Sequence, residues 1–361
     1  MSDNDPLLPL RQRIDDIDSN ILALISERAE CAIEVAKVKQ ASGENNFYRP
    51  EREAQVLQKI KDKNPGPLSD EAMAWLFREI MSACLALEQK LKIAYLGPEG
   101  SFTQFAALKQ FGHGVNTVSC NAIDEIFREV ESGNANYGVV PVENSTEGMV
   151  NQTMDLFVTS QLKICGEVQL RIHQNLMARI ADMSSIKKIY SHQQSFAQCR
   201  EWLNAHMVGI DQIAVKSNAE AARLASLEPE TAAIAGEAAA EIYHLQMLVR
   251  NIEDDSENTT RFLVISNQET EPSGSDKTSL LFAANNRPGS LYGLLEPFRR
   301  FGISMTRVES RPSRKGVWEY IFFVDIEGHI KDKNIQHALI DISKEASLVK
   351  VLGSYPRASL S

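Results

Sequence analysis

Two cationic side chains in the N-terminal part of the sequence have a spacing that suits a small dianion. Arg28 and Lys39 are eleven residues apart in a segment whose apolar residues recur every three or four positions, which indicates one long amphipathic helix. At ~100° per residue the two side chains fall within about 20° of each other on one helix face, roughly 16 Å apart along the axis. They could grip a compact dianion between them, or they could belong to an ordinary solvated face.

A third cation on the same expected helix, Arg11, lies too far away to serve that site. It precedes Arg28 by seventeen residues, which places it about 25 Å away and rotated by roughly 100°. A helix of ~35 residues spans about 50 Å and is too long to be buried inside a helical segment of ~90 residues. We therefore expect Arg11 to complete a site in a second copy of the chain. A homodimer is predicted, and whether dimers pair into tetramers is left open.

Polar side chains follow expected strands of the middle segment, at the points where these strands end. They are Ser101 after Lys92–Leu96, Asn144 and Ser145 after Tyr137–Val142, and Ser191 and Gln194 after Ile189-Tyr190. Open α/β sheets bind ligands at the carboxyl ends of their strands, and a helix N-terminus capped by Ser101 or Thr103 attracts carboxylates. The pattern predicts a site for a small carboxylate.

The sequence is compatible with more than one role for two residues of these stretches, His192 and Glu143. His192 could belong to a nucleophilic triad, but the sequence contains no Gly-x-Ser-x-Gly elbow, and a structural histidine is the simpler interpretation. Glu143 could be a base, an anchor for other residues or a helix cap, and the sequence does not decide among these.

Composition excludes several classes of protein. A net charge of −10 without a block of Lys and Arg argues against nucleic acid and anionic membranes as partners. No apolar run approaches the ~20 residues needed to span a bilayer. The five cysteines are scattered, so neither a metal site nor a disulfide framework is expected, and a reduced, cytoplasmic location is predicted. No dinucleotide fingerprint and no Walker A sequence occurs, so we expect no nucleotide cofactor.

The chain is expected to be multidomain, with four parts of different periodicity. Residues 1–91 are predicted to be all-α, with helices over about 6–42, Pro50–Lys63 and Ser69–Lys90. Residues 92–266 alternate short strands with helices, which indicates an α/β fold of two lobes. Residues 267–277 are small and polar and are typical of a linker. Residues 278–355 follow the strand-helix-strand-strand-helix-strand order of an α+β, ferredoxin-like domain.

The helical part resembles the all-helical chorismate mutase family, in Leu7-Leu8-x-Leu10-Arg11, Glu27-Arg28, Val38-Lys39, Pro50-Glu51-Arg52-Glu53 and Leu76-Phe77-Arg78-Glu79-Ile80 to Glu88. The resemblance implies an intertwined dimer in which Arg11 reaches the partner's site. It implies Lys39 and Glu88 as catalytic residues beside the ether oxygen, and substrate binding by Arg11, Arg28, Arg49, Arg52, Glu53 and Cys84. Turning chorismate into prephenate is a pericyclic rearrangement, which needs a compact conformer and stabilised negative charge but no nucleophile or metal.

Three of these positions depart from the family. Cys84 and Arg49 stand where a Ser and an Asp are common, and Glu88 stands where a Gln is common. A carboxyl group can donate a hydrogen bond only when it is protonated. We therefore expect apolar surroundings to hold Glu88 neutral, and mutase activity to decline as the pH rises.

The middle part resembles the prephenate dehydratases, in Gly97–Thr103, Pro141–Ser145, Ser191–Phe196 and Thr260-Arg261-Phe262. The resemblance implies two α/β lobes like those of a periplasmic binding protein, with Ser191–Phe196 in one lobe and the other three stretches in the second. It implies Thr260 as the catalytic hydrogen-bond donor to the leaving hydroxyl and Arg261 as a carboxylate clamp. Substrate positioning would fall to Ser101, Asn144, Ser145, Ser191 and Gln194.

The C-terminal part resembles the regulatory ACT domains in two motifs, Gly289-Ser290-Leu291 and Glu309-Ser310-Arg311-Pro312. The pattern alone favours a structural unit without a ligand over a ligand-binding one. The resemblance implies that two such domains pair and that phenylalanine binds between them, at Gly289, Ser290, Leu291, Glu309, Ser310 and Arg311.

Taken together, the three resemblances imply consecutive steps of phenylalanine biosynthesis. Chorismate would be rearranged to prephenate, prephenate would be decarboxylated and dehydrated to phenylpyruvate, and phenylalanine would inhibit, with no cofactor or metal. Two alternatives remain: a dehydratase that prefers arogenate, which carries an amine in place of the keto group, and a non-catalytic amino-acid sensor.

Overall fold

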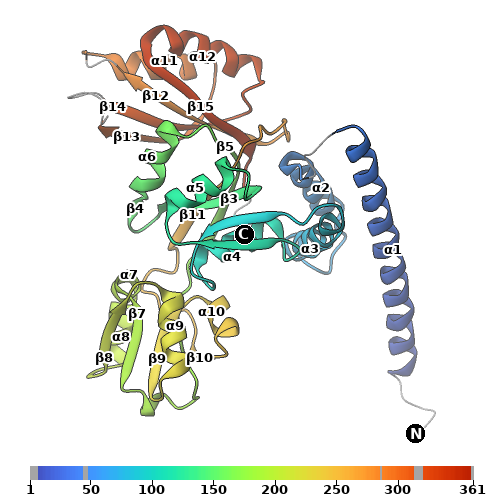
Figure 1. Cartoon of the computed structure of the whole chain (residues 1–361), viewed down its shortest axis with the longest axis vertical. Helices are drawn as coiled ribbons and strands as arrows, with labels where there is room; N and C mark the ends of the chain where they lie inside the picture. Colours follow the sequence, from blue (N-terminus) through green and yellow to red (C-terminus); the bar gives the residue numbers. More distant parts are fainter. Residues whose placement is uncertain (1–6, 44–47, 285–286, 313–319, 359–361) are drawn as a thin grey trace. The chain divides into compact units, whose positions relative to one another are not determined.

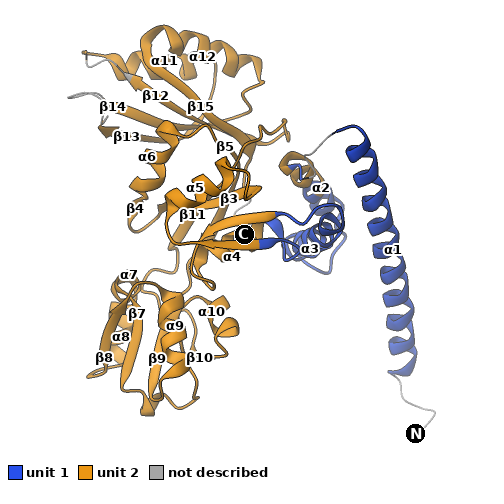
Figure 2. Ribbon diagram, in the orientation of Figure 1, with its two compact units in different colours: residues 1–49, 57–91, 111–116 blue, residues 50–56, 92–110, 117–361 orange. Residues whose placement is uncertain are grey.

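The computed structural model describes residues 7–43, 48–284, 287–312 and 320–358. The chain divides into two compact units, one of residues 1–49, 57–91 and 111–116 and one of residues 50–56, 92–110 and 117–361 (Figure 2). Three predicted features fall outside the described residues: the helix start at residue 6, the loop residue Asn286 and the first two residues of the strand expected from Trp318.

The first unit is helical, as predicted (Figure 1). Its sequence forms α1 (Leu8–Ala41), α3 (Asp70–Glu88) and the second half of α2 (Pro50–Lys63), whose residues 50–56 belong to the second unit. After α1, Gly43 has a φ of +72°, the left-handed conformation that favours glycine behind a helix. Before α3, the Ser69 hydroxyl accepts a hydrogen bond from the Ala72 N–H at 3.2 Å, so the predicted cap is confirmed.

The second unit contains three sheets, and the first of them holds three of the four dehydratase stretches. Its strand order is β2-β1-β3-β11-β5, with β4 paired to β3. β1 and β3 are parallel, whereas β11 runs antiparallel between β3 and β5. The elements are β1 (Lys92–Leu96), α4 (Phe102–Phe111), β2 (Asn116–Cys120), α5 (Ile123–Glu131), β3 (Tyr137–Asn144), β4 (Gly148–Met149), α6 (Asn151–Thr159), β5 (Lys163–Arg171) and β11 (Thr259–Ser266).

The second sheet carries the remaining stretch, Ser191–Phe196, which confirms the predicted division between two lobes. Its order is β10-β6-β9-β7-β8, with β7 parallel to both β8 and β9. The elements are β6 (Asn175–Ala178), a 3₁₀ turn (Met183–Ser185), β7 (Lys188–His192), α7 (Gln193–Gln198), α8 (Arg200–His206), β8 (Asp211–Val215), α9 (Asn218–Leu227), β9 (Thr231–Ala235), α10 (Glu237–Ile242) and β10 (Gln246–Val249).

The third sheet has the predicted ferredoxin-like topology, with antiparallel order β13-β14-β12-β15. One face is covered by two helices, whose Leu294, Phe298, Ile335 and Ile342 share a core with the strands. The elements are β12 (Asp276–Ala284), α11 (Ser290–Arg300), β13 (Met305–Pro312), β14 (Tyr320–Glu327), α12 (Lys333–Glu345) and β15 (Ala346–Pro356).

The opposite face of the third sheet packs against the first sheet. Leu281, Leu352 and Tyr355 belong to the same buried core as Val140 and Leu263 of the first sheet. A Cβ atom placed on Gly353 would lie 2.1 Å from the carbonyl oxygen of Ile164, so only glycine lets β15 approach β5 this closely. The C-terminal domain therefore shares its core with the first lobe, and β12 already begins at Asp276, inside the expected linker.

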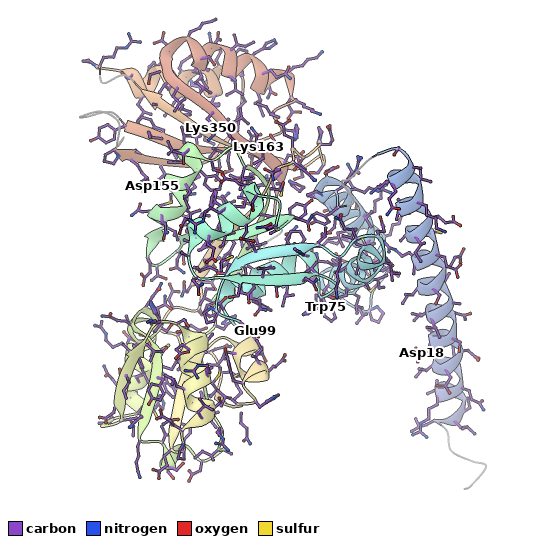
Figure 3. The ribbon with its side chains drawn as sticks, in the orientation of Figure 1. Asp18, Trp75, Glu99, Asp155, Lys163 and Lys350 are labelled. Atoms are coloured by element: carbon purple, nitrogen blue, oxygen red, sulfur yellow. The ribbon has the colours of Figure 1, made fainter. Side chains whose placement is uncertain are left out.

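Two lysines reinforce this junction of sheets (Figure 3). Lys163 Nζ on β5 donates to the carbonyl of Val351 at 3.1 Å. Lys350 Nζ on β15 donates to the carbonyls of Phe157 at 2.9 Å and Ser160 at 2.5 Å, at the end of α6. Burial, with Lys163 nearby, lowers the pKa of Lys350. The two sheets are thus joined by hydrogen bonds as well as by apolar packing.

Candidate active sites

The first candidate site lies in the helical unit, where Glu88 at the end of α3 faces two cations of α1. Burial raises the pKa of the Glu88 carboxyl, while the positive charges of Lys39 and Arg28 oppose this rise. Among the described residues, the buried Oε2 atom of Glu88 has no hydrogen-bond partner. Cys84, one helical turn earlier, is buried at 4% exposure. The arrangement places a carboxyl group with a raised pKa beside two cations. When protonated, it could donate a hydrogen bond to an incoming anion.

The other predicted mutase residues are placed less completely. Arg11 is exposed on the first turns of α1, far along the helix from Lys39. Arg49 precedes α2 in an extended conformation, and Arg52 and Glu53 lie in its first turn, within the segment assigned to the second unit. The roles of these four residues therefore stay predictions.

One face of α1 consists of large apolar side chains that this chain leaves exposed. Five of them recur every three or four residues along the first half of the helix: Leu10 58%, Ile14 55%, Ile17 47%, Ile21 49% and Leu24 65%. A contiguous apolar stripe of this length marks a protein interaction surface.

The second candidate site is centred on Thr260, at the start of β11. In the sheet register Thr260 lies opposite Asn144, and Nδ2 of Asn144 donates to Thr260 Oγ1 at 2.8 Å and to Asn258 Oδ1 at 2.8 Å. Asn144 Oδ1 in turn accepts from the N–H groups of Thr146 and Glu147. Because Thr260 Oγ1 acts as an acceptor toward Asn144, its own proton can be donated to another group.

Asn258 belongs to this cluster although the sequence-based site did not include it. It is 2% exposed and accepts hydrogen bonds from Asn144 and Thr146, while its buried Nδ2 has no partner among the described residues. Its place directly before the Thr-Thr-Arg-Phe run was the signal that could have found it.

Two predicted serines have structural contacts around this cluster. Ser101 caps α4, since its hydroxyl accepts from the Gln104 N–H at 3.3 Å and donates to the carbonyl of Leu96 at 2.8 Å. Ser145 Oγ accepts from the Thr259 N–H at 3.0 Å, which fastens the start of β11 to the end of β3. Both hydroxyls hold the local backbone of the candidate site.

The stretch in the second lobe is organised by Asn218, a residue that sequence reasoning missed. Ser191 is fully buried, and its hydroxyl donates to the carbonyl of Ile234 at 3.0 Å and to Asn218 Oδ1 at 3.2 Å. Asn218 also accepts from the N–H of His192. The ring of His192 accepts from the Gln194 N–H and caps α7, so the structural interpretation of this histidine is confirmed. The side chain of Gln194 is half-buried.

Arg261 lies in a different environment from the one expected for a carboxylate clamp. Its guanidinium is 10% exposed and pairs with Glu167 on β5, at 2.9 Å, and with Asp325 on β14, at 2.6 Å. Tyr355 accepts a further hydrogen bond at 3.0 Å. Because successive residues of a strand point to opposite faces, the side chain that follows Thr260 is directed toward the C-terminal domain. The carboxylates of Glu167 and Asp325 thus bind Arg261, where a carboxylate of the substrate was expected.

Glu143 makes a contact that favours the role of an anchor among those left open for it. Its carboxylate pairs with Arg307 Nε of β13 at 3.3 Å. Arg311, expected at the phenylalanine site, pairs with Asp155 of α6 at 2.9 Å and donates to the carbonyl of Asn151 (Figure 3 labels Asp155). Residues of β13 thus face the first lobe.

The remaining predicted phenylalanine-binding residues lie on the C-terminal domain. Gly289 has a φ of +81° and precedes α11, whose first residue Ser290 donates to the carbonyl of Arg287 at 2.6 Å. Leu291 is 39% exposed. On β13, Glu309 is half-buried and Ser310 is exposed. The role of these residues in binding phenylalanine stays a prediction.

Comparisons with known proteins cover all three parts of the chain. Residues 10–89 match the family described as chorismate mutase type II, residues 93–270 match prephenate dehydratase and residues 278–343 match the ACT domain. No helix in the described part of the chain is long and apolar enough to cross a membrane.

A full-length relative and two solved structures are similar to this chain. The bifunctional chorismate mutase/prephenate dehydratase of Stutzerimonas stutzeri is 56% identical over 100% of both chains. Prephenate dehydratase from Arthrobacter aurescens, solved in complex with L-Phe, is 32% identical with a TM-score of 0.68, covering 74% of this chain and 90% of that one. GqqA, described as a novel type of quorum quenching acylase, is 30% identical with a TM-score of 0.68, covering 74% and 98%. The chain belongs to the family of bifunctional chorismate mutase/prephenate dehydratases.

Proposed function

We propose that Lys39 and Glu88 carry out the first of two successive reactions and Thr260 the second. The chain has chorismate mutase and prephenate dehydratase activities and belongs to phenylalanine biosynthesis. The observation that carries the proposal is the hydrogen bond from Asn144 to Thr260 Oγ1, because it leaves the threonine proton to be donated.

In the mutase step, the enzyme holds chorismate in the compact conformer that rearranges. Arg28 and Arg52 would bind the carboxylates, and Lys39 and protonated Glu88 would stabilise negative charge on the ether oxygen as its bond to carbon breaks. The raised pKa of Glu88 and its unpartnered oxygen support this role. Cys84, Arg49 and Glu53 would complete the pocket.

Glu88 makes the mutase step pH-dependent. With its pKa raised, the carboxyl stays protonated to a higher pH than an ordinary glutamate; turnover is full below that pKa and falls as the pH rises through it. We expect Glu88→Gln, a donor at every pH, to flatten this decline. The measurement is chorismate turnover across pH, with the dehydratase profile of the same variant as the control. Coincident mutase profiles of the two proteins would remove Glu88 from the step.

We propose that the chain forms a homodimer in which Arg11 enters the partner's mutase site. The exposed apolar stripe of α1 from Leu10 to Leu24 supports this, because a second copy would cover it. Along the same helix, Arg11 is too distant from Lys39 to act on one substrate molecule with it. We also propose a cytoplasmic location, where unpaired cysteines such as these are the rule.

In the dehydratase step, prephenate loses carbon dioxide and hydroxide, and its ring becomes aromatic. The electron pair of the breaking carbon–carboxylate bond enters the ring as the hydroxyl departs. Thr260 would donate its proton in a hydrogen bond to that hydroxyl, which leaves as water once a proton is supplied. Asn144, with Asn258 behind it, fixes the direction of the Thr260 hydroxyl. Ser101, Ser145, Ser191 and Gln194 would position the substrate, the serines through the backbone that they hold.

We further propose that phenylalanine binds the C-terminal domain and inhibits the dehydratase. The Arthrobacter aurescens relative bound L-Phe in its crystal structure, which supports the assignment. The left-handed Gly289 and the N-terminus of α11 offer backbone N–H groups for a carboxylate. Ser290, Leu291, Glu309, Ser310 and Arg311 would complete the site in paired domains.

Supplying the purified protein with chorismate and no cofactor tests the whole assignment. We expect phenylpyruvate to accumulate, and phenylalanine to suppress it. Parallel assays with prephenate and arogenate distinguish the two dehydratase substrates by their kcat/KM ratio. A protein that binds phenylalanine but turns over none of the three acids would be the amino-acid sensor, and the proposal would be wrong.

A further inference from the structure

Thr260 and Asn144, the two central residues of the dehydratase cluster, each have a sequence neighbour that forms an ion pair with the C-terminal domain. Thr260 is followed by Arg261, which pairs with Asp325. Asn144 is preceded by Glu143, which pairs with Arg307. Thr260 and Asn144 face each other in the sheet register, as do Arg261 and Glu143. The neighbouring strands β3 and β11 therefore direct Asn144 and Thr260 to one face of the sheet, and Glu143 and Arg261 to the opposite face.

The anchors on the C-terminal domain form a matching pair. Arg307 on β13 and Asp325 on β14 are also register partners in their own sheet. Two facing residues of β3 and β11 thus meet two facing residues of β13 and β14, with opposite charges at both contacts. We call Glu143, Arg261, Arg307 and Asp325 the charge quartet.

The surroundings of the quartet hold its geometry. Glu167, whose side chain is fully buried, binds both Arg261 and Lys277 of β12, the latter at 2.8 Å. Asp325 also accepts from Ser279 at 2.5 Å. A buried ion pair is costly to break by separating or removing one partner, because the remaining charge is left without compensation. Relative movement of the two sheets would therefore have to break or rebuild these contacts together, rather than stretch them gradually.

We propose that the charge quartet is the positioning device through which phenylalanine on the C-terminal domain controls Thr260. The inference rests on the proposed inhibition by phenylalanine and adds its route. Movement of β13 and β14 reaches Arg261 and Glu143 directly, and each of these is joined by one peptide bond to a residue whose hydrogen bond directs the catalytic hydroxyl. Arg261 is in this scheme a positioning residue, acting through Thr260.

The decisive variant is Asp325→Asn, which removes one charge of the quartet and keeps the size of the side chain. Asp341→Asn is the matched control, since Asp341 pairs with Arg300 and Lys344 on the exposed side of the same domain. Three quantities are measured for the full-length protein: dehydratase turnover without phenylalanine, turnover at saturating phenylalanine, and the dissociation constant of phenylalanine by calorimetry.

For Asp325→Asn we expect phenylalanine to bind within about threefold of its wild-type affinity but to lose its effect, so that residual turnover at saturation rises about tenfold. Asp341→Asn should match the wild type in all three quantities. A purely structural role would change stability and leave the depth of inhibition unaltered; inhibition of Asp325→Asn to wild-type depth therefore overturns the inference. If the wild type itself neither binds phenylalanine nor is inhibited, the proposed regulation fails instead.

The second contact keeps the inference testable if Asp325→Asn does not fold. Glu143 and Arg307 are less buried, at 38% and 14% exposed, so Glu143→Gln and Arg307→Gln should be tolerated. We expect each variant to weaken inhibition, and the double variant to weaken it no further than the stronger single one, because both remove the same contact. Unchanged inhibition in both single variants would refute the coupling.

Discussion

Replacing Thr260 by alanine is expected to reduce prephenate turnover by about 10²–10⁴-fold, the range typical for loss of a positioned proton donor. The alanine variant keeps the strand but has no hydroxyl to assist departure of the leaving group. Chorismate turnover, which uses residues of the helical unit, should stay at the wild-type level. Both rates can be measured on one preparation, so the mutase serves as an internal check on folding.

Two further variants make this result specific. Thr259→Ala changes the same residue type one position earlier, where the hydroxyl donates to the Glu257 carbonyl at 2.9 Å, and it should retain most dehydratase turnover. Thr260→Ser keeps the hydroxyl and should retain more activity than Thr260→Ala. Dehydratase turnover of Thr260→Ala close to that of the wild type would exclude Thr260 from the mechanism.

The second large effect is expected from mixing two inactive mutase variants. Lys39→Ala and Arg11→Ala should each lose about 10²–10³-fold in chorismate turnover, because each removes a cation from every site. In a mixed dimer, the site with an intact Lys39 receives its Arg11 from the Lys39→Ala chain and is complete. Random exchange of subunits should therefore restore about a quarter of wild-type activity, since half of the dimers are mixed and each has one complete site.

Restored chorismate turnover shows that Arg11 acts in the partner's site only if the restoration depends on subunit exchange. The two variants are mixed after partial denaturation and refolding, and an equal mixture without exchange is the control. Activity that never rises above the sum of the two variants would show that Arg11 serves its own chain or no site at all.

Local signals explain why the helices and the site stretches could be predicted. Pro50 begins α2, Ser69 caps α3 and Gly43 follows α1, and each acts on the backbone within a few residues of itself. Thr260 and Asn144 were found because polar residues at strand ends are local features too. Their hydrogen bond forms only because β11 pairs with β3 in the sheet. The order of the motifs predicted that the two residues lie in one lobe, but it did not predict this strand pairing.

The sequence did not indicate five strands, β2, β4, β6, β8 and β10. Three of them, β2, β8 and β10, are edge strands, which pair on one side only and need no buried residues on both faces. β8 is almost entirely exposed along its length. Without alternation or a continuous apolar run, such segments resemble loops in the sequence.

Arg261 shows what sequence reasoning could not reach. An arginine beside a threonine predicted to be catalytic is expected to bind a substrate carboxylate, because nothing local distinguishes it from one that binds protein carboxylates. Its partners Glu167 and Asp325 are 94 and 64 residues away along the chain. Only the packing of β5 and β14 around β11 reveals them, and the same holds for Glu143 and Arg307.

The core shared by the first and third sheets limits how the proposed inhibition by phenylalanine could be removed. A shortened chain that ends before Asp276 would uncover the apolar surface now packed against Leu281, Leu352 and Tyr355, and would leave Arg261 with only Glu167 as an ionic partner. We expect such a chain to aggregate and to hold Thr260 in a less defined position. If phenylalanine binds near Gly289 as proposed, strains that overproduce phenylalanine are therefore better sought through single substitutions there than through removal of the C-terminal domain.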